Sequence, residues 1–237
     1  MPYFRKQRIA KYIVRSLFVL FVLFVNVLLI WRVFISTNMP KTVRTMTPNP
    51  TLSAAYAQYG DGLTLRYQNQ EQVTSAKKNY GYFAVTQCVF IPEARQVQIV
   101  VRYNNSTLKH LALDYGLSEI PSKDSHLFDV TLVKTTDLTP DIADDDLVDT
   151  TTFSTVRYQP SEAYVRDTTQ LYTYYRYVFD NVELDELTIG VFADVYYVED
   201  VDYEKPAYGT LCLYDNRSPW LTYKPTKDDR RAMAAAD

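Results

Sequence analysis

The most pronounced hydrophobic pattern in this chain is an apolar run near its N terminus. Residues 17–31 are apolar except for Asn26, and Arg15 and Arg32 lie on either side. Extended to 13–35, the stretch is long enough to cross about 30 Å of hydrocarbon as a helix. Because it is apolar on all sides, it differs from the one-sided pattern of a surface helix. We predict a single transmembrane helix over 13–35.

A cleaved signal peptide is the alternative for this segment, but such peptides end in small residues. Here the run ends with Trp-Arg-Val-Phe-Ile at 31–35, which favours an uncleaved anchor. Basic residues dominate 1–12, and lysine and arginine prefer the cytoplasmic side of a membrane. We expect a cytoplasmic basic segment at 1–12, with the bulk of the chain extracytoplasmic in a cell membrane protein.

Residues 36–60 have a different pattern, rich in Thr, Ser, Asn and Pro. Pro40, Pro48 and Pro50 discourage one continuous helix. We predict a stalk or linker over 36–60, with a short helix near 52–59 packing against the domain that follows. At the other end, 224–237 is charged and then alanine-rich, and is predicted to be a tail that frays or forms a short helix.

Between these segments, residues 61–223 alternate with a period of two, which is typical of half-buried strands. Val97, Ile99, Val101 and Tyr103, for example, alternate with more polar positions. Strands are predicted at 82–91, 97–103, 128–132, 152–158, 171–179, 187–197 and 209–215, with an eighth at 63–67. This many short strands fit one mostly β domain, which we interpret as an immunoglobulin-like β-sandwich, with a Greek-key β-barrel as the alternative.

The formal net charge of −3 conceals an uneven distribution. Residues 1–60 contain no Asp or Glu, so the remainder holds all 28 acidic residues and 17 of the 25 basic ones, for a formal charge of −11. An acidic exported portion argues against nucleic acid as a partner and against close adhesion to anionic lipid.

Tyrosine is abundant, with 21 residues in the chain, and the densest patch is 171–177. In an extended strand Tyr172 and Tyr174 share one face, while Tyr175 and Tyr177 share the other. An outward face of this kind would suit a protein interface or stacking against sugars. The alternative is cross-strand aromatic packing that stabilises the sheet.

The acidic stretch 137–149 contains the candidate calcium ligands Asp141, Asp144 and Asp146. It lacks the glycine and the terminal glutamate of an EF-hand loop, so a solvated loop or a short helix is the favoured interpretation. Two histidines and two cysteines provide no zinc-ligand spacing, and we expect neither a metal nor a cofactor.

The two cysteines, Cys88 and Cys212, lie in predicted strands near opposite ends of the β domain. In an exported protein they are a candidate disulfide, but two separate buried thiols would leave the same sequence pattern. Both interpretations stay open.

An N-terminal anchor, an exported β domain and the order His, Cys, Arg together resemble a sortase, a transpeptidase of bacterial cell walls. The matching residues are His110 or His126, Cys212 within Thr-Leu-Cys at 210–212, and Arg217. The resemblance implies that Cys212 attacks an acyl group, a histidine transfers protons and Arg217 supports the oxyanion. In this chain Thr-Leu runs directly into the cysteine, whereas the family has a further Thr in that motif.

We favour a non-enzymatic interpretation over this one. The predicted function is a membrane-anchored, extracytoplasmic binding or scaffolding module of the cell envelope, with an envelope protein or a carbohydrate as its partner.

Overall fold

The computed structural model describes residues 2–68, 82–137 and 153–235. It divides into two compact units, Met1–Asn38 and Met39–Asp237, and we call the second unit the head. The first unit is the helix α1 (Pro2–Thr37). Within α1, Val14–Val33 has a mean hydropathy of 2.4 and none of its apolar window is buried. By length and composition it agrees with the membrane span predicted over 13–35.

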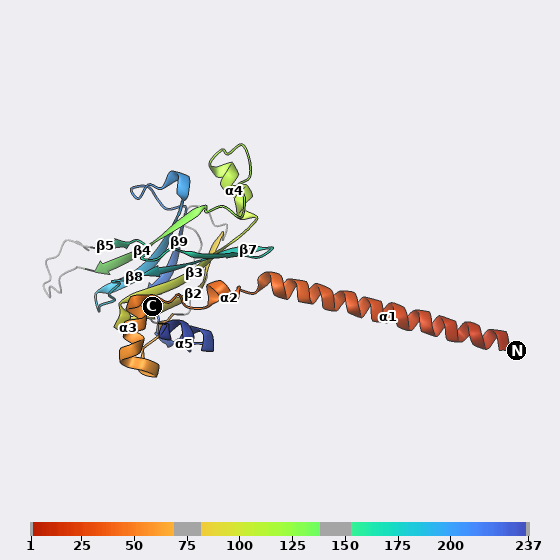
Figure 1. The fold of residues 1–237 in the computed structure, drawn as a ribbon. Coiled ribbons are helices and arrows are strands. Elements are labelled where there is room, and N and C mark those ends of the chain that lie inside the picture. The colour runs from red at the N-terminus through yellow and green to blue at the C-terminus, as the bar shows by residue number, and fades with distance from the viewer. Residues whose placement is uncertain (1, 69–81, 138–152, 236–237) are drawn as a thin grey trace, which may run out of the picture. The chain divides into compact units, whose positions relative to one another are not determined.

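The head contains two antiparallel sheets, which confirms the prediction of a mostly β domain (Figure 1). The six-stranded sheet has the order β10 (Leu221–Thr222), β1 (Arg66–Tyr67), β2 (Phe83–Ile91), β3 (Gln96–Asn104), β7 (Tyr172–Phe179) and β6 (Val165–Thr168). The four-stranded sheet has the order β5 (Phe153–Tyr158), β4 (Phe128–Asp137), β8 (Thr188–Tyr197) and β9 (Gly209–Asp215). The immunoglobulin-like arrangement is not confirmed by these sheets.

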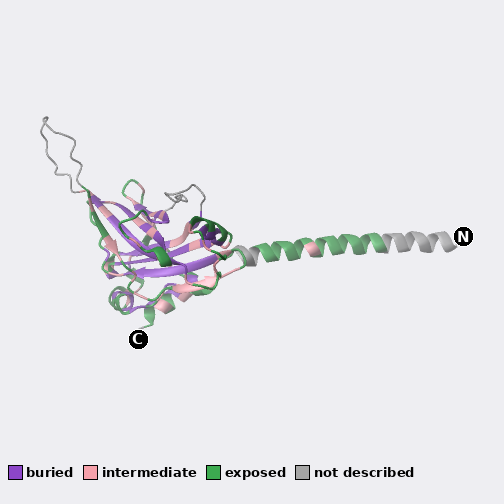
Figure 2. Cartoon of the chain, turned by 90° about the horizontal axis from the view of Figure 1, so that it is seen from above, coloured by how far each residue is buried: buried purple, intermediate pink, exposed green. Residues whose placement is uncertain are grey.

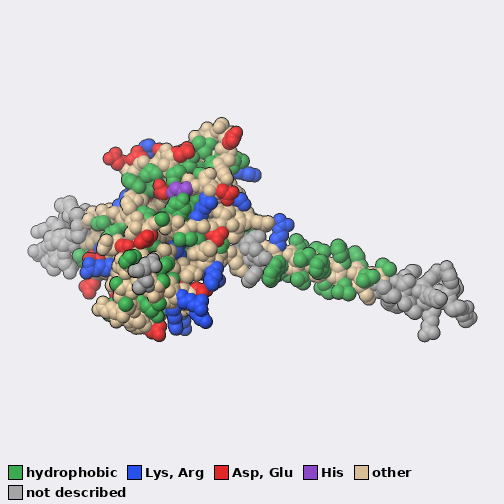
Figure 3. Space-filling view, viewed as in Figure 1, with side chains coloured by type: hydrophobic (Ala, Val, Ile, Leu, Met, Phe, Trp, Pro, Cys, Tyr) green, Lys and Arg blue, Asp and Glu red, His purple; other side chains and the backbone are tan. Residues whose placement is uncertain are grey.

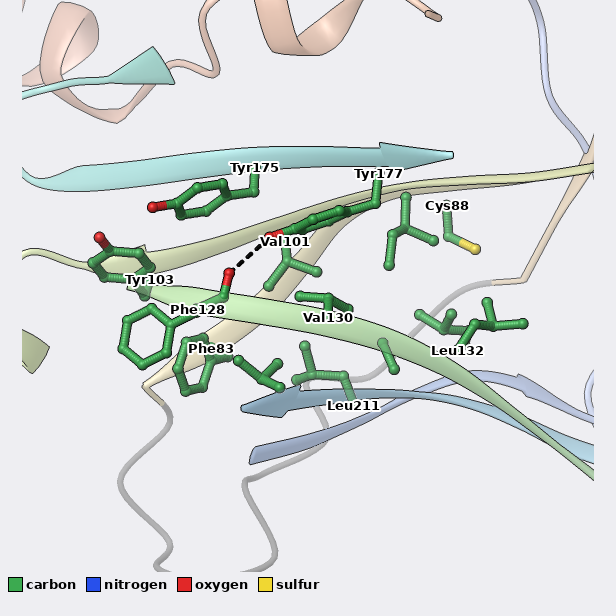
Figure 4. Packing of buried hydrophobic residues seen from close by; sticks show 14 of the residues in the cluster. Phe83, Cys88, Val101, Tyr103, Phe128, Val130, Leu132, Tyr175, Tyr177 and Leu211 are labelled. Carbon is green, nitrogen blue, oxygen red and sulfur yellow. Dashed lines mark hydrogen bonds between the residues drawn. The ribbon is translucent and has the colours of Figure 1, made fainter. Parts of the chain in front are cut away.

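The two sheets enclose one core, built from the alternate positions that face inward (Figure 4). Along β3, Val97, Ile99, Val101 and Tyr103 are at most 2 % exposed. Figure 2 shows the buried residues concentrated along the strands. The hydroxyl of Tyr177 donates a hydrogen bond of 2.9 Å to the backbone carbonyl of Phe128, which ties β7 to β4 of the opposite sheet. The period of two in the sequence therefore identified the core face of these strands.

The outer face of the six-stranded sheet is covered by α2 (Lys41–Arg44), α3 (Pro50–Tyr59) and α5 (Lys227–Ala234). Met46, Leu52 and Met233 are at most 1 % exposed and pack in one cluster with Val89 and Ile91 of β2. From residue 39 onward, the predicted stalk is therefore wrong. The predicted C-terminal tail likewise includes a helix that is packed on the sheet.

Both longer covering helices have strong start signals. The side chain of Asn49 accepts a hydrogen bond of 2.9 Å from the N–H of Leu52, and Pro50 occupies the first turn of α3. Thr226 and Asp229 form a reciprocal capping box at the start of α5. The helix predicted near 52–59 is confirmed in this way.

A buried arginine joins this covering layer to the sheet. The Arg176 residue is 1 % exposed, and its Nε donates to the carbonyl oxygen of Val43 at 2.8 Å. Its Nη2 donates to the carbonyl oxygen of Arg44 at 2.8 Å, and its Nη1 to Gln98 Oε1 at 3.0 Å. Burial lowers the pKa of Arg176 to about 10, so the guanidinium is still charged at neutral pH. A buried charge of this kind is tolerated only where it is hydrogen-bonded.

The same network extends to the C-terminal helix. Gln87 accepts a hydrogen bond from Arg176 and donates one of 2.7 Å to the hydroxyl of Tyr223. That hydroxyl donates to Asp229 at 3.1 Å, and Asp229 also accepts the backbone N–H of Met46 at 2.8 Å. Asp229 is completely buried. One continuous network thus connects the segment after α1, the sheet and α5.

Several short elements were not predicted from the sequence. They are β6, β10, α2, α4 (Thr107–Asp114) and the 3-10 helices η1 (Gly60–Gly62), η2 (Pro92–Ala94) and η3 (Val198–Asp200). Strands of two to four residues are too short to show a period, and α4 has only eight residues. The start of the strand predicted at 152–158 lies outside the described residues, which resume at Phe153.

Replacing Arg176 with alanine should destabilise the head by about 3 kcal/mol, because the substitution leaves buried carbonyl oxygens without donors and the Asp229 carboxylate without a compensating charge. Arg102→Ala is the matched control. Arg102 lies on the same face of the sheet but stacks on Tyr172 at 4.4 Å, so its loss should cost less than about 1 kcal/mol. Urea unfolding of the full-length protein measures the free energy of unfolding of both variants. Equal losses of stability in the two variants would contradict the proposed role of Arg176.

Candidate functional site

One end of the head carries a groove of about 680 Å³, which we call the end groove. The β2–β3 turn, the loop between β7 and β8 and the end of β9 form its walls, because the antiparallel register brings these three points together. The side chains that line it include Arg66, Phe90, Arg95, Glu183, Asp185, Glu186, Tyr214 and Trp220. A volume of this size lies within the range of roughly 300 to 1,000 Å³ that small-ligand sites occupy.

Aromatic rings form one wall of the end groove. Tyr214 and Trp220 are stacked, with ring centroids 4.9 Å apart and an angle of 18° between the planes. Phe90 meets Trp220 edge-on at 5.0 Å. Trp220 is partly buried, because it packs against the core as well as lining the groove. Phe90 and Tyr214 are themselves buried, so they anchor Trp220, the most exposed of the three rings, in the core.

Charged side chains also line the groove, and ion pairs hold several of them in place. Arg95 and Glu183 form an ion pair of 2.8 Å. Lys134, whose side chain is only 9 % exposed, binds Asp185 at 3.0 Å and the carbonyl oxygen of Glu183 at 2.8 Å. A hydrogen bond from Thr188 and the contact with Lys134 keep the pKa of Asp185 below its ordinary value. Asp185 is consequently a carboxylate at neutral pH.

The backbone beside the groove adopts an uncommon conformation twice. Arg95 has a φ of 49° and Asn181 a φ of 59°, both in the left-handed region. The N–H of Val182 donates to the carbonyl oxygen of Arg95 at 2.8 Å, which joins the two turns. They are the two non-glycine residues with positive φ among the described residues. Such conformations persist only where the surrounding structure enforces them, and they are enriched at binding sites.

The arrangement suits a ligand that has both polar groups and a ring face that can stack on an aromatic side chain. An aromatic wall can cover one face of a ring, while Asp185 and Glu186 can accept hydrogen bonds from hydroxyl or amine groups. Arg66 and Arg95 supply donors across the same opening.

The tyrosines predicted as a binding surface lie elsewhere. Tyr174, Tyr175 and Tyr177 are at most 2 % exposed, and Tyr172 is half-buried. Tyr175 and Tyr177 are stacked in the core at 6.0 Å, whereas Tyr174 packs beneath Val43 of the covering layer. The prediction of an exposed aromatic surface is therefore wrong for these three, and the alternative of packing within the sheet describes them.

The two cysteines are thiols rather than a disulfide. Cys88 faces the core, but the core contacts of β9 come from Leu211 and Leu213, so Cys212 points to the other face of its sheet. Cysteines on faces that do not meet cannot be bridged.

The residues of the sortase resemblance are not brought together either. His126 binds Asp129 at 2.7 Å and stacks on Tyr164 at 4.2 Å. Cys212 of β9 pairs with Phe192 of β8, which in turn pairs with Val133 of β4. His126 precedes the start of β4 at Phe128, and the strand covers about 16 Å between Phe128 and Val133. His126 and Cys212 are therefore separated along the length of the sheet.

The remaining candidates have structural partners. His110 stacks on Tyr82 at 5.1 Å. Arg217 pairs with Asp215 at 2.9 Å, and its side chain is 87 % exposed. Burial, assisted by Asp215, raises the pKa of the Cys212 thiol, whereas a nucleophilic cysteine requires a lowered one.

The candidate calcium ligands Asp141, Asp144 and Asp146 lie outside the described residues. Elsewhere, within residues 2–68, 82–137 and 153–235, no cluster of three or more His, Cys, Asp or Glu could hold a metal ion.

Sequence reasoning did not identify the end groove. The turn at 92–95 was recognisable from Pro92, but Trp220 and the loop at 180–187 carry no motif. A tryptophan near a strand end, outside the periodic pattern, was the one available signal.

Comparison of the chain with protein-family models, with curated proteins and with solved structures finds no match.

Cys212 should react slowly with iodoacetamide at neutral pH, because its raised pKa keeps it as a thiol. We expect the rate at pH 7 to be about tenfold below that of the same cysteine in urea-unfolded protein, and to rise steeply through the alkaline range. Peptide mapping by mass spectrometry measures the rate and separates Cys212 from Cys88. A native rate at pH 7 above the unfolded rate would restore the thiol-enzyme interpretation.

Proposed function

We propose that this chain is a single-pass membrane protein whose extracytoplasmic head binds a carbohydrate of the cell envelope in the end groove. The observation that carries the proposal is that the stacked pair Tyr214 and Trp220 lines the same groove of ligand size as the carboxylates Glu183, Asp185 and Glu186. The head thereby acts as a binding or scaffolding module rather than as an enzyme.

Carbohydrate is favoured over an envelope protein by the shape and chemistry of the groove. A sugar ring offers an apolar face to stack on Trp220 and hydroxyl groups that donate to Asp185 and Glu186. Protein interfaces are generally broader, burying about 800 Å² on each partner. The groove is closer to the dimensions of a small-molecule site.

The orientation in the membrane is part of this proposal. The basic residues of 1–12 support a cytoplasmic N terminus by the preference of lysine and arginine for that side. The head, which contains the acidic residues of the chain, is then extracytoplasmic. An immunoglobulin-like sandwich, with a Greek-key barrel as its alternative, stays a proposal for the finer fold of this domain.

The rival function, a cysteine transpeptidase resembling a sortase, has no observation in its favour. Its cysteine has a raised pKa, and its candidate histidines contact other residues.

Replacing Trp220 with alanine should weaken carbohydrate binding about tenfold, because the ligand loses its stacking surface. Tyr203→Ala is the matched control, since Tyr203 is 43 % exposed but does not line the groove. The probe is an array of neutral and acidic envelope oligosaccharides, presented to the full-length protein in detergent.

Trp220→Phe keeps an aromatic ring and should retain part of the affinity for the oligosaccharide. Comparison of this variant with Trp220→Ala separates loss of stacking from loss of folding. Wild-type protein that binds no oligosaccharide on the array, or equal binding by the Trp220 and Tyr203 variants, would refute carbohydrate binding in the end groove.

A further inference from the structure

Exposed basic side chains gather on the covering layer, although the chain beyond residue 60 is acidic. We call them the basic face, and they are Lys41, Arg44, Lys224, Lys227, Arg230 and Arg231. Among the described residues, three solvent-accessible carboxylates, Asp61, Asp167 and Asp228, lie among or beside these six cations. The buried Asp229 is offset by Arg176 within the same network, so the basic face has a net charge of about three. Figure 3 shows lysine and arginine side chains gathered over α5.

The cations come from α2, from α5 and from the segment just before α5, but form one surface. Lys41 of α2 binds Asp228 of α5 at 2.9 Å, and Arg231 approaches the same carboxylate at 4.0 Å. Lys41, Arg44 and Arg231 together lower the pKa of Asp228. Even in these pairs the side chains of Lys41 and Arg231 are 65 % and 70 % exposed, so both can still contact an outside partner.

The basic face begins close to α1 along the chain. Lys41 follows Thr37, the last residue of α1, by four positions. Because consecutive Cα atoms are about 3.8 Å apart, the chain can place Lys41 no more than roughly 15 Å from that helix end, whichever way the head is turned. The Debye length at physiological salt is about 8 Å, and this bound allows Lys41 to come within that range of a charged membrane surface.

We propose that the basic face binds the anionic phospholipid headgroups of the membrane that holds α1. The proposal is independent of the end groove and needs only the membrane anchor. The total charge of −11 beyond residue 60 argued against such contact. Salt screening limits the range over which each charge acts. The local surplus of lysine and arginine, rather than the total charge, therefore determines what this surface attracts.

The test uses the full-length protein in lipid nanodiscs. A donor fluorophore is attached through Ala234→Cys, at the exposed end of α5, in a Cys212→Ser background, and the lipid carries an acceptor. Energy transfer should be stronger in discs that contain phosphatidylglycerol than in discs of phosphatidylcholine alone. High salt should abolish the difference.

The combination Lys227→Glu and Arg231→Glu should reduce the ratio of docked to undocked heads at least about tenfold in phosphatidylglycerol discs. The matched control reverses two exposed lysines outside the covering layer, Lys109→Glu and Lys123→Glu, and should leave the transfer unchanged.

Equal transfer in the two kinds of disc by the labelled protein with an unaltered basic face would by itself overturn the proposal. An equal effect of the two double variants would overturn it as well, because general charge would then be the cause. Trp220→Ala should not alter the transfer, so failure of this proposal is distinguishable from failure of carbohydrate binding.

Discussion

The buried guanidinium of Arg176 is the group on which the outer layer of the head depends. It binds the backbone carbonyl oxygens of Val43 and Arg44 and the side chains of two sheet glutamines, Gln87 and Gln98. A charge in such a place is tolerated only while all of these partners stay in position. The residues that follow α1 are therefore ordered on the sheet instead of forming a spacer.

The hydrogen bonds of Arg176 hold the covering layer in place and so determine which faces of the head are covered. The inner face of the six-stranded sheet packs against the other sheet, and its outer face is occupied by α2, α3 and α5. The end groove lies at loops beyond these two faces, where Lys134 and Thr188 hold the β7–β8 loop. The covering layer, in turn, concentrates basic side chains from both ends of the head's sequence.

The tyrosine strand illustrates how far sequence reasoning reached. It placed Tyr172 and Tyr174 on one face and Tyr175 and Tyr177 on the other, as in β7. It could not show that both faces are buried, because Tyr174 is covered by Val43, 131 positions earlier in the chain. The end groove escaped prediction for the same reason, since the residues that line it come from four separate segments.

The sequence by itself determined the apolar span, the period-two strands and the starts of α3 and α5. These features depend on residues within a few positions of one another, so local spacing and capping chemistry are sufficient to specify them. Only the tertiary structure decided that residues 39–60 cover the sheet, that the cysteines face apart, and that Trp220 and charged residues line one groove. Each of these depends on contacts between distant segments, whose geometry the local pattern does not contain.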